Sequence, residues 1–261
     1  SGPSEAPSGT DVIINFTAYS PAGISNINTQ TAGVNITNAT AVTGSASEAL
    51  RTNITACSRF EGTGNYANYT CNVTMWWWDG AGTWLVTAFI KDNQSNLAVN
   101  KTANLSVGSR TAFVLGPATL AWPGISPGAT NQTSNNDPMT LNNTGNAVIS
   151  SPNVAINASD LRGESTATQF LWAGNFSAYT ATGGGACSGA ACTECFGTQM
   201  VNGTSYAGVT GANLTKGNYT TGAGNGYTGQ EQLYFCLRIT DTVLSTQSYS
   251  TKLWNWIVQI T

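Results

Sequence analysis

Apolar and polar residues alternate with a period of two along most of this chain, and no stretch carries a helical period of useful length. Because successive side chains of a strand point to opposite faces, the pattern predicts an all-β protein. The turn residues from Asp79 to Gly82 predict a hairpin between the strands on either side of them. We expect strands at residues 11–18, 33–37, 50–57, 69–77, 83–92, 102–108, 233–239 and 250–260.

The pattern changes near Gly108, which predicts a boundary between two domains. Beyond this point the chain becomes rich in turn residues and carries a fresh set of strands, and residues 180–228 are mostly small or polar. A chain of 261 residues, 41% of them apolar, is long enough for two cores. We therefore expect two immunoglobulin-like or jelly-roll-like β-sandwich domains, at residues 1–108 and 109–261, the second with long loops.

The glycosylation sequon Asn-x-Ser/Thr recurs at 16 positions, some of which a chain rich in Asn, Ser and Thr forms by chance. On five predicted strands the sequon asparagine lies opposite the apolar face: Asn15, Asn35, Asn53, Asn72 and Asn104. A bulky hydrophilic glycan cannot lie in a core, so we expect N-linked glycans on outer faces of the sandwiches. The other sequons begin at Asn38, Asn68, Asn93, Asn100, Asn131, Asn142, Asn157, Asn175, Asn202, Asn213 and Asn218.

Charged residues are scarce. They make up 8% of the chain, against roughly a quarter in an ordinary soluble protein, so glycans would have to supply much of the surface hydration. The net charge of −3 forms no basic stripe, and we expect no nucleic-acid partner. No apolar run approaches the ~20 residues of a membrane span, and the sequence is interpreted as a mature exported chain whose leader has been removed.

The residue types limit the chemistry. The sequence has no histidine, which removes Ser-His and Cys-His nucleophile pairs and histidine metal ligands. Its 12 carboxylates form no recognisable acid–base pair, and no phosphate-binding loop occurs. We therefore expect no catalytic residue, no cofactor, no metal and no enzymatic activity, and a secreted hydrolase ranks third among the functions considered.

Six cysteines, an even number in an exported chain, predict three disulfides. We expect Cys57 to pair with Cys71. The other four, Cys187, Cys192, Cys195 and Cys236, allow three connectivities, and the sequence does not choose among them. Their spacing also fits a plant-type [2Fe-2S] cluster or a four-thiolate zinc site, but an oxidising compartment disfavours both.

Three consecutive tryptophans, Trp76, Trp77 and Trp78, close the strand that carries Asn72. Alternation places Trp77 on the core side and the other two on the side of the sequon. Rings of this size would be covered by a loop or the second domain, would stack on the chain's own glycans, or would dock against a neighbouring subunit. We therefore count Trp76 and Trp78 as candidate subunit-interface residues.

Two stretches carry a family resemblance. GTWLVTAFIKDNQSNLAVNKTANLSV, residues 82–107, resembles the closing hairpin of PKD-type and other immunoglobulin-like domains of archaeal and bacterial surface proteins. ISPGATNQTSNNDPMTLNNTGN, residues 125–146, is similar to the opening of secreted archaeal β-sandwiches and TasA-like filament subunits. This second resemblance implies a subunit that polymerises by donating an N-terminal strand to the next subunit.

Carried over by position, the donated strand would be residues 11–18, within an N-terminal segment 1–18. The residues that would fill pockets of the next subunit are Val12, Ile14, Phe16 and Ala18. The alternative is that residues 11–18 form the first strand of their own domain.

These features predict a glycosylated, extracellular structural protein of an archaeal cell surface, whose partners are copies of itself in a filament. A surface-layer protein and a carbohydrate-binding adhesin module are the alternatives.

Overall fold

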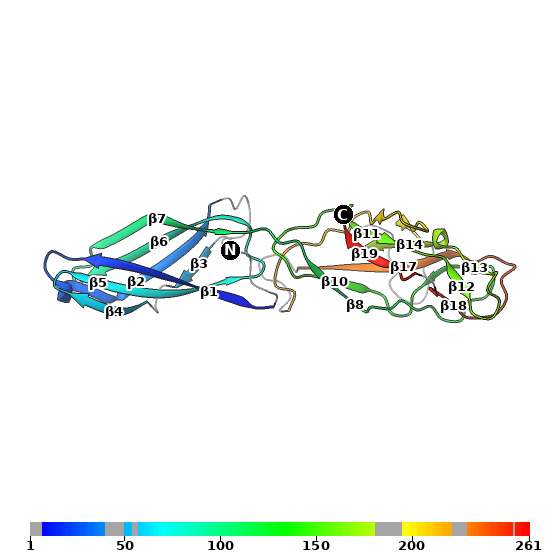
Figure 1. Ribbon diagram of the computed structural model, residues 1–261, viewed down its shortest axis with the longest axis horizontal. Helices are drawn as coiled ribbons and strands as arrows, with labels where there is room; N and C mark the ends of the chain where they lie inside the picture. Colours follow the sequence, from blue (N-terminus) through cyan, green and yellow to red (C-terminus); the bar gives the residue numbers. More distant parts are fainter. Residues whose placement is uncertain (1–6, 40–49, 54–56, 181–194, 221–228, 253) are drawn as a thin grey trace. The chain divides into compact units, whose positions relative to one another are not determined.

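The computed structural model describes residues 7–39, 50–53, 57–180, 195–220, 229–252 and 254–261. In these ranges every regular element longer than three residues is a β-strand, which confirms the all-β class (Figure 1). The chain divides into unit 1, which comprises Ser1–Ala112, Thr144–Ala147 and Lys216–Thr228, and unit 2, which comprises Phe113–Asn143, Val148–Thr215 and Gly229–Thr261. The first break lies close to the expected residue 108, whereas the two short returns to unit 1 were not expected.

Unit 1 is a sandwich of two antiparallel sheets (Figure 1). One sheet has the order β1-β5-β4, with the bounds Gly9–Tyr19, Tyr66–Trp76 and Ser58–Thr63. The other has the order β3-β2-β6-β7, with the bounds Leu50–Asn53, Ile27–Asn38, Gly82–Asp92 and Leu97–Val107. A short 3-10 turn, η1 (Ile24–Asn26), precedes β2.

Alternate residues of these strands build the core of unit 1. The inner face of β5 buries Ala67, Tyr69, Cys71, Val73 and Met75, and that of β6 buries Trp84, Val86, Ala88 and Ile90. The residues between them are half-buried or exposed. The period-two pattern of the sequence therefore corresponds to inner and outer faces, as it does in a two-sheet sandwich.

The strand order of unit 1 leaves one position empty. An immunoglobulin-type sandwich has the order A-B-E-D in one sheet and adds C′ to C, F and G in the other. Taking β1 as B makes β5 and β4 strands E and D, and makes β3-β2-β6-β7 the order C′-C-F-G. In the described residues no strand occupies position A, beside β1.

The expected donor strand belongs to its own unit. β1 pairs with β5 over eleven consecutive positions, from Gly9 opposite Trp76 to Tyr19 opposite Tyr66. Residues 11–18 therefore form the first strand of this chain's own sandwich, which is the alternative that the sequence left open. Val12, Ile14 and Phe16 are half-buried against the core of unit 1, and Ala18 is buried in it.

The prediction of a hairpin around Asp79–Gly82 is wrong. β5 and β6 belong to different sheets, so this turn carries the chain from one sheet to the other. The consecutive strands of unit 1 that pair antiparallel are β2 with β3, β4 with β5 and β6 with β7. The turn between β4 and β5 contains Gly64, whose positive φ of 58° suits glycine. β4 was missed because its residues, Ser58–Thr63, carry no alternation and are all exposed.

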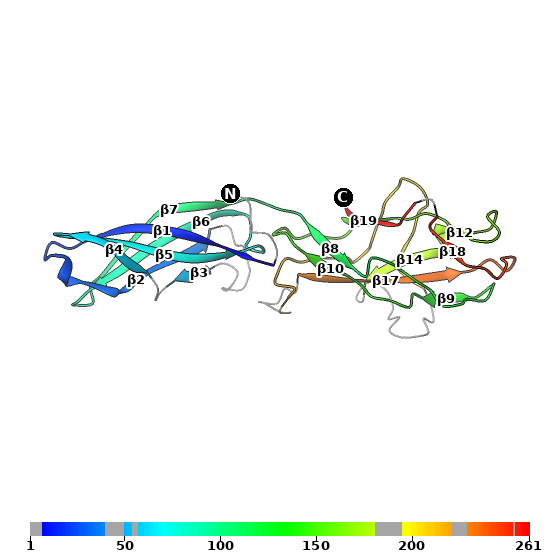
Figure 2. The same cartoon turned by 60° about the horizontal axis from the view of Figure 1, so that its bottom comes forward.

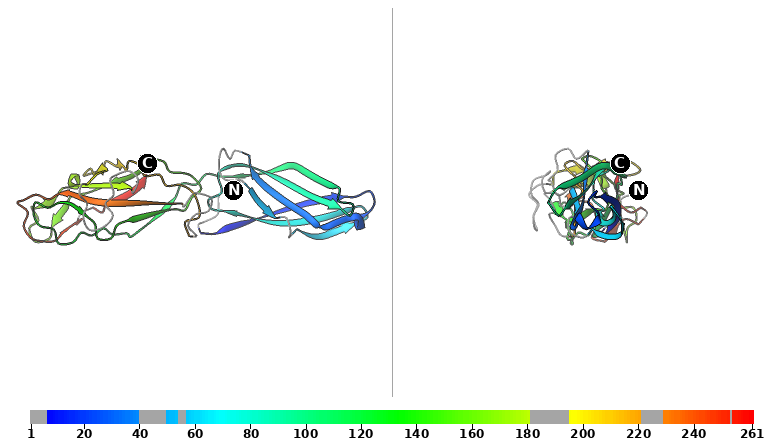
Figure 3. Two further views of the ribbon diagram at one scale, coloured as in Figure 1. Left: turned by 180° about the vertical axis from the view of Figure 1, so that it is seen from behind. Right: turned by 90° about the vertical axis from the view of Figure 1, so that its left-hand side faces the viewer.

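Unit 2 is built around β17 (Gln230–Ile239), the long orange strand in Figures 1 and 3. Its main sheet has the order β15-β14-β17-β10-β8, and β9 also pairs with β17. The other strands of this sheet are Thr198–Gln199, Phe176–Thr180, Met139–Asn143, Phe113–Gly116 and Thr130–Thr133. The buried side chains Leu141, Phe176, Leu233, Phe235 and Leu237 form the centre of its core.

Two small antiparallel sheets complete unit 2, one of order β16-β11-β19 and one of order β13-β12-β18. Their strands are Ala207–Gly208, Val154–Asn157 and Ile257–Ile260, and Phe170–Leu171, Leu161–Gly163 and Tyr249–Ser250. The single strand expected at 250–260 is therefore two short ones, β18 and β19. Trp254, between them, is 72% exposed rather than part of an apolar face.

Two disulfides lie in the described residues. Cys57 pairs with Cys71, as expected, and joins β5 to the residue before β4. Cys195 pairs with Cys236 of β17, which selects one pairing from those that the sequence left open. Cys187 and Cys192 lie outside the described residues. An iron–sulfur or zinc site on the four cysteines is incompatible with the Cys195–Cys236 bond, because two of the thiolates are consumed.

The Cys57–Cys71 bond closes a loop with a sequence separation of 14. Replacing both cysteines by alanine should lower the free energy of unfolding by about 3 kcal/mol, the chain-entropy value for a loop of this length. Urea denaturation followed by tryptophan fluorescence measures this change, with Ser58→Ala, at an exposed neighbour, as the control. A loss below about 1 kcal/mol, the size of an ordinary substitution, would contradict the structural role of the bond.

Candidate functional site

A groove of about 700 Å³ runs along unit 1 between β1 and β7, and we call it the β1–β7 groove. Its lining comes from residues 14–22, 26–27, 86, 88–92, 96–100 and 102–103. Figure 2 shows both strands on the same side of unit 1. Each is the outer strand of its sheet, β1 pairing with β5 and β7 with β6. In the described part of the chain, the other edge of each strand therefore has no strand partner.

Apolar side chains line the bottom of the groove. Ile14 and Phe16 of β1 face it from one sheet, and Val86, Ala88 and Ile90 of β6 face it from the other. The charged residues that line it, Lys91 and Asp92, lie at the β6–β7 turn. An uncharged floor between two unpaired strand edges has the chemistry of a site for an extended, apolar peptide segment.

The β7 wall of the groove is exposed although it faces inward. Directly opposed residues of an antiparallel pair share a face, and Ala98 and Asn100 oppose the buried Ile90 and Ala88 of β6. Both are nevertheless exposed. No strand of the opposite sheet covers them, because β1 is the last strand of that sheet.

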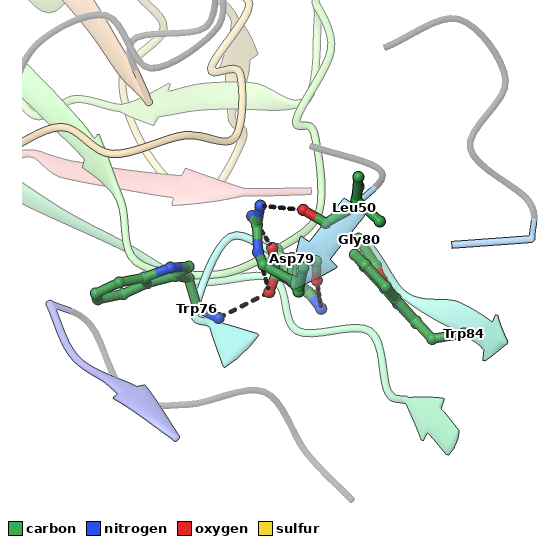
Figure 4. A network of polar contacts seen from close by, with 7 residues as sticks. Leu50, Trp76, Asp79, Gly80 and Trp84 are labelled. Atoms are coloured by element: carbon green, nitrogen blue, oxygen red, sulfur yellow. Dashed lines mark hydrogen bonds and ion pairs between the residues drawn. The ribbon is translucent and has the colours of Figure 1, made fainter. Parts of the chain in front are cut away.

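A second site candidate is the turn that follows β5, where the Asp79 carboxylate is the central acceptor (Figure 4). It accepts hydrogen bonds from Nε of Arg51 at 3.1 Å, from Nη2 of the same residue, and from the Trp76 backbone N–H at 2.7 Å. The Asn146 Nδ2 amide, on the Thr144–Ala147 return, donates to the Asp79 carbonyl at 2.9 Å. Nε1 of Trp84 donates to the neighbouring Gly80 carbonyl at 2.9 Å.

Burial raises the pKa of the Asp79 carboxyl, and this outweighs the hydrogen bond and the charge of Arg51, which lower it. Both partners are well shielded, with side-chain exposures of 1% and 13%. Every oxygen contact of Asp79 goes to a group that fixes the turn. The pair therefore acts as a latch between β3 and the β5–β6 turn.

The latch positions the tryptophans. Trp77 is fully buried and meets Tyr219, on the Lys216–Thr228 return, edge to face at 5.7 Å. Trp78 packs edge-on against Trp77 at 4.3 Å and stacks on Trp76 at 5.2 Å. Of these three tryptophans, Trp76 is the most exposed, at 36%. Unit 1 thus supplies ring partners for Trp78, which is half-buried, and leaves more of the Trp76 ring open to a neighbour.

The sequons differ in how their asparagines are held. Asn15, Asn72 and Asn104 are exposed on outer faces, as expected from the alternation. Asn35 and Asn53 are half-buried, and Nδ2 of Asn53 donates to the Asn72 carbonyl at 2.6 Å. The remaining exposed sequon asparagines are Asn93, Asn100, Asn202 and Asn213, and the half-buried ones are Asn38, Asn68, Asn131, Asn142, Asn175 and Asn218.

Asn157 fits glycosylation least. Its side chain is buried, and its Nδ2 donates to the carbonyls of Gly203 and Ser205. A glycan is attached through Nδ2 and leaves one hydrogen on it, so one of these bonds would be lost.

The groove was missed by the sequence reasoning, which began the last strand of unit 1 at residue 102. In the structure β7 begins at Leu97. The signal was present in the apolar residues Leu97 and Val99, which alternate with Ala98 and Asn100 ahead of the expected strand. Arg51 and Asp79 were missed because their pairing depends on β3 and the β5–β6 turn meeting in space.

In the described residues, no group of three or more His, Cys, Asp or Glu side chains could hold a metal ion. Over the same residues, no helix has the length and apolar character needed to cross a membrane. Comparisons with protein-family models, with curated proteins and with solved structures gave no significant match for this chain.

Asp79→Ala should lower the free energy of unfolding by about 3 kcal/mol, the low end for breaking a buried ion pair. The low end applies because Arg51 retains a hydrogen bond to the Leu50 carbonyl. Chemical denaturation measures the loss, and tryptophan fluorescence of the folded variant should report increased exposure of the ring cluster. The control is Glu164→Ala, which breaks the half-exposed ion pair with Lys252 and should cost less than about 1 kcal/mol. Equal losses in the two variants would mean that the latch has no special role.

Glycopeptide mapping of protein made in an N-glycosylating host should find carbohydrate on Asn15, Asn72 and Asn104, and a bare Asn157. The reason is that the first three are exposed, whereas Asn157 uses its amide nitrogen inside the fold. Carbohydrate on Asn157 together with three bare outer sites would contradict the assignment of the outer faces.

Proposed function

We propose that this chain is a structural, non-enzymatic subunit of a glycosylated extracellular polymer, which grows when a β-strand of one copy enters the β1–β7 groove of another. The observation that carries the proposal is the empty strand position between two unpaired edges. An inserted strand would satisfy backbone N–H and C=O groups along at least one of these edges and would cover the apolar floor.

The edges of the groove carry few of the features that keep natural sheets apart. Protected edges normally have proline, inward-pointing charge or a very short strand. β1 and β7 are both eleven residues long and contain no proline. The protective features of β7 are Lys101 and the bulge at residues 101–102, and the edge from Leu97 to Asn100 has neither. These edges are suited to accept a strand rather than to repel one.

The occupant that fits best is a second copy of this chain. The eight residues before β1, SGPSEAPS, have no apolar alternation and are poorly suited to fill the groove themselves. An uncharged floor selects an uncharged strand, and only 8% of this chain is charged. The two disulfides support an oxidising, extracellular setting in which such polymers are found.

The main alternative is a carbohydrate-binding adhesin, and Trp76 is the residue that favours it. Its ring is partly exposed and is held flat against Trp78, with an interplanar angle of 8°. A rigid aromatic face can stack on a sugar ring. A surface layer would use the same strand addition in a sheet-like lattice, and imaging distinguishes a lattice from a thread.

Ala98→Trp should abolish polymers, because the new ring projects from the β7 wall into the groove. The matched control is Leu85→Trp, at a 43% exposed position on the outer face of β6, which should polymerise like the parent protein. Negative-stain electron microscopy and sedimentation measure assembly, and circular dichroism confirms that both variants fold. Normal polymers from folded Ala98→Trp would overturn the groove as the assembly site. Monomers of the parent protein that bind sugars through Trp76 would support the adhesin instead.

A further inference from the structure

Asn100 occupies an unusual place among the sequons, because its side chain is on the groove side of β7. It opposes Ala88, which is buried on the inner face of β6, and it lines the groove. Asn104, four residues further along the same strand, opposes Leu85 on the outer face.

A β-bulge causes this difference. Residues four apart on a regular strand point to the same side, so Asn100 would share the outer face of Asn104. Between these asparagines, however, the pairing steps from Val86–Ala103 to Ala88–Asn100. This step covers three residues along β7 but only two along β6. One extra residue moves every following side chain to the opposite face. The bulge at residues 101–102 thereby turns a sequon into the groove.

The amide of Asn100 is arranged for modification without loss of a contact. Its Oδ1 accepts from the Thr102 backbone N–H at 2.9 Å and from the Thr102 hydroxyl at 2.7 Å. In the described residues no hydrogen bond engages its Nδ2, the atom that takes the glycan. Asn53 and Asn157, in contrast, spend that nitrogen on backbone carbonyls.

We propose that carbohydrate on Asn100 closes the β1–β7 groove, so that only copies with a bare Asn100 accept a strand. The proposal rests on the function proposed above and assigns its regulation. A strand added beside β1 would lie across the groove from the inner face of β7, and the first sugar attached at Asn100 would project from that face into the same space. A glycan at Asn104 lies on the outer face of β7, opposite Leu85, and leaves the groove open because Asn104 does not line it.

The test uses protein made in an N-glycosylating host and separated into polymer and unassembled fractions. Glycopeptide mapping should find carbohydrate on Asn104 in both fractions, and carbohydrate on Asn100 only in the unassembled one. Two variants, Asn100→Gln and Thr102→Ala, each remove this sequon by a different residue, and both should move the unassembled material into polymers. Ser106→Ala, which removes the sequon of Asn104, is the matched control and should leave the distribution unchanged.

The outcomes separate the two proposals. Equal occupancy of Asn100 in both fractions, or a bare Asn100 in all material, overturns the regulation and leaves strand addition standing. If Asn100→Gln and Thr102→Ala leave the division between polymer and unassembled protein unchanged, the regulation is likewise overturned and strand addition stands. Absence of polymer from every variant, including those with a bare Asn100, overturns strand addition and the regulation with it.

Discussion

The backbone N–H and C=O groups at the edge of a sheet need hydrogen-bond partners, and the rest of this structure depends on that constraint. Unit 1 satisfies most of its backbone with two sheets, yet β1 and β7 end those sheets beside one another with an apolar floor between them. A strand position that is empty but lined on three sides is favourable to fill, because each added residue gains ladder hydrogen bonds and buries apolar surface. The assembly and the regulation proposed above both rest on this geometry.

Two local devices maintain that geometry. The Asp79–Arg51 pair fixes the turn that carries the chain from one sheet to the other, and so holds the tryptophan cluster at one end of β5. The bulge of β7 reverses the faces of residues 97–100, so that Ala98 and Asn100 oppose the buried Ile90 and Ala88. The ion pair fixes the connection between the two sheets, and the bulge determines which side chains of β7 face the β1–β7 groove.

Alternation predicted the class, most strands of unit 1 and which faces carry Asn15, Asn72 and Asn104, since period and face are directly linked. It could not predict which strands pair. The β5–β6 turn has hairpin composition but joins two sheets, and the partners of β1 are set by contacts distant in sequence. β4 was not predicted because the residues on both its faces are exposed, so its sequence does not alternate between apolar and polar residues. The groove lay beyond the sequence because it is defined by a missing neighbour and by a bulge, and neither has a local signature.

The most direct test of the central claim is a cryo-electron microscopy reconstruction of polymers formed by the glycosylated protein. The account predicts a strand from a second molecule lying between β1 and β7, hydrogen-bonded along at least one of them, with no sugar density on Asn100. Polymers in which the groove is empty and subunits meet through other surfaces would contradict it.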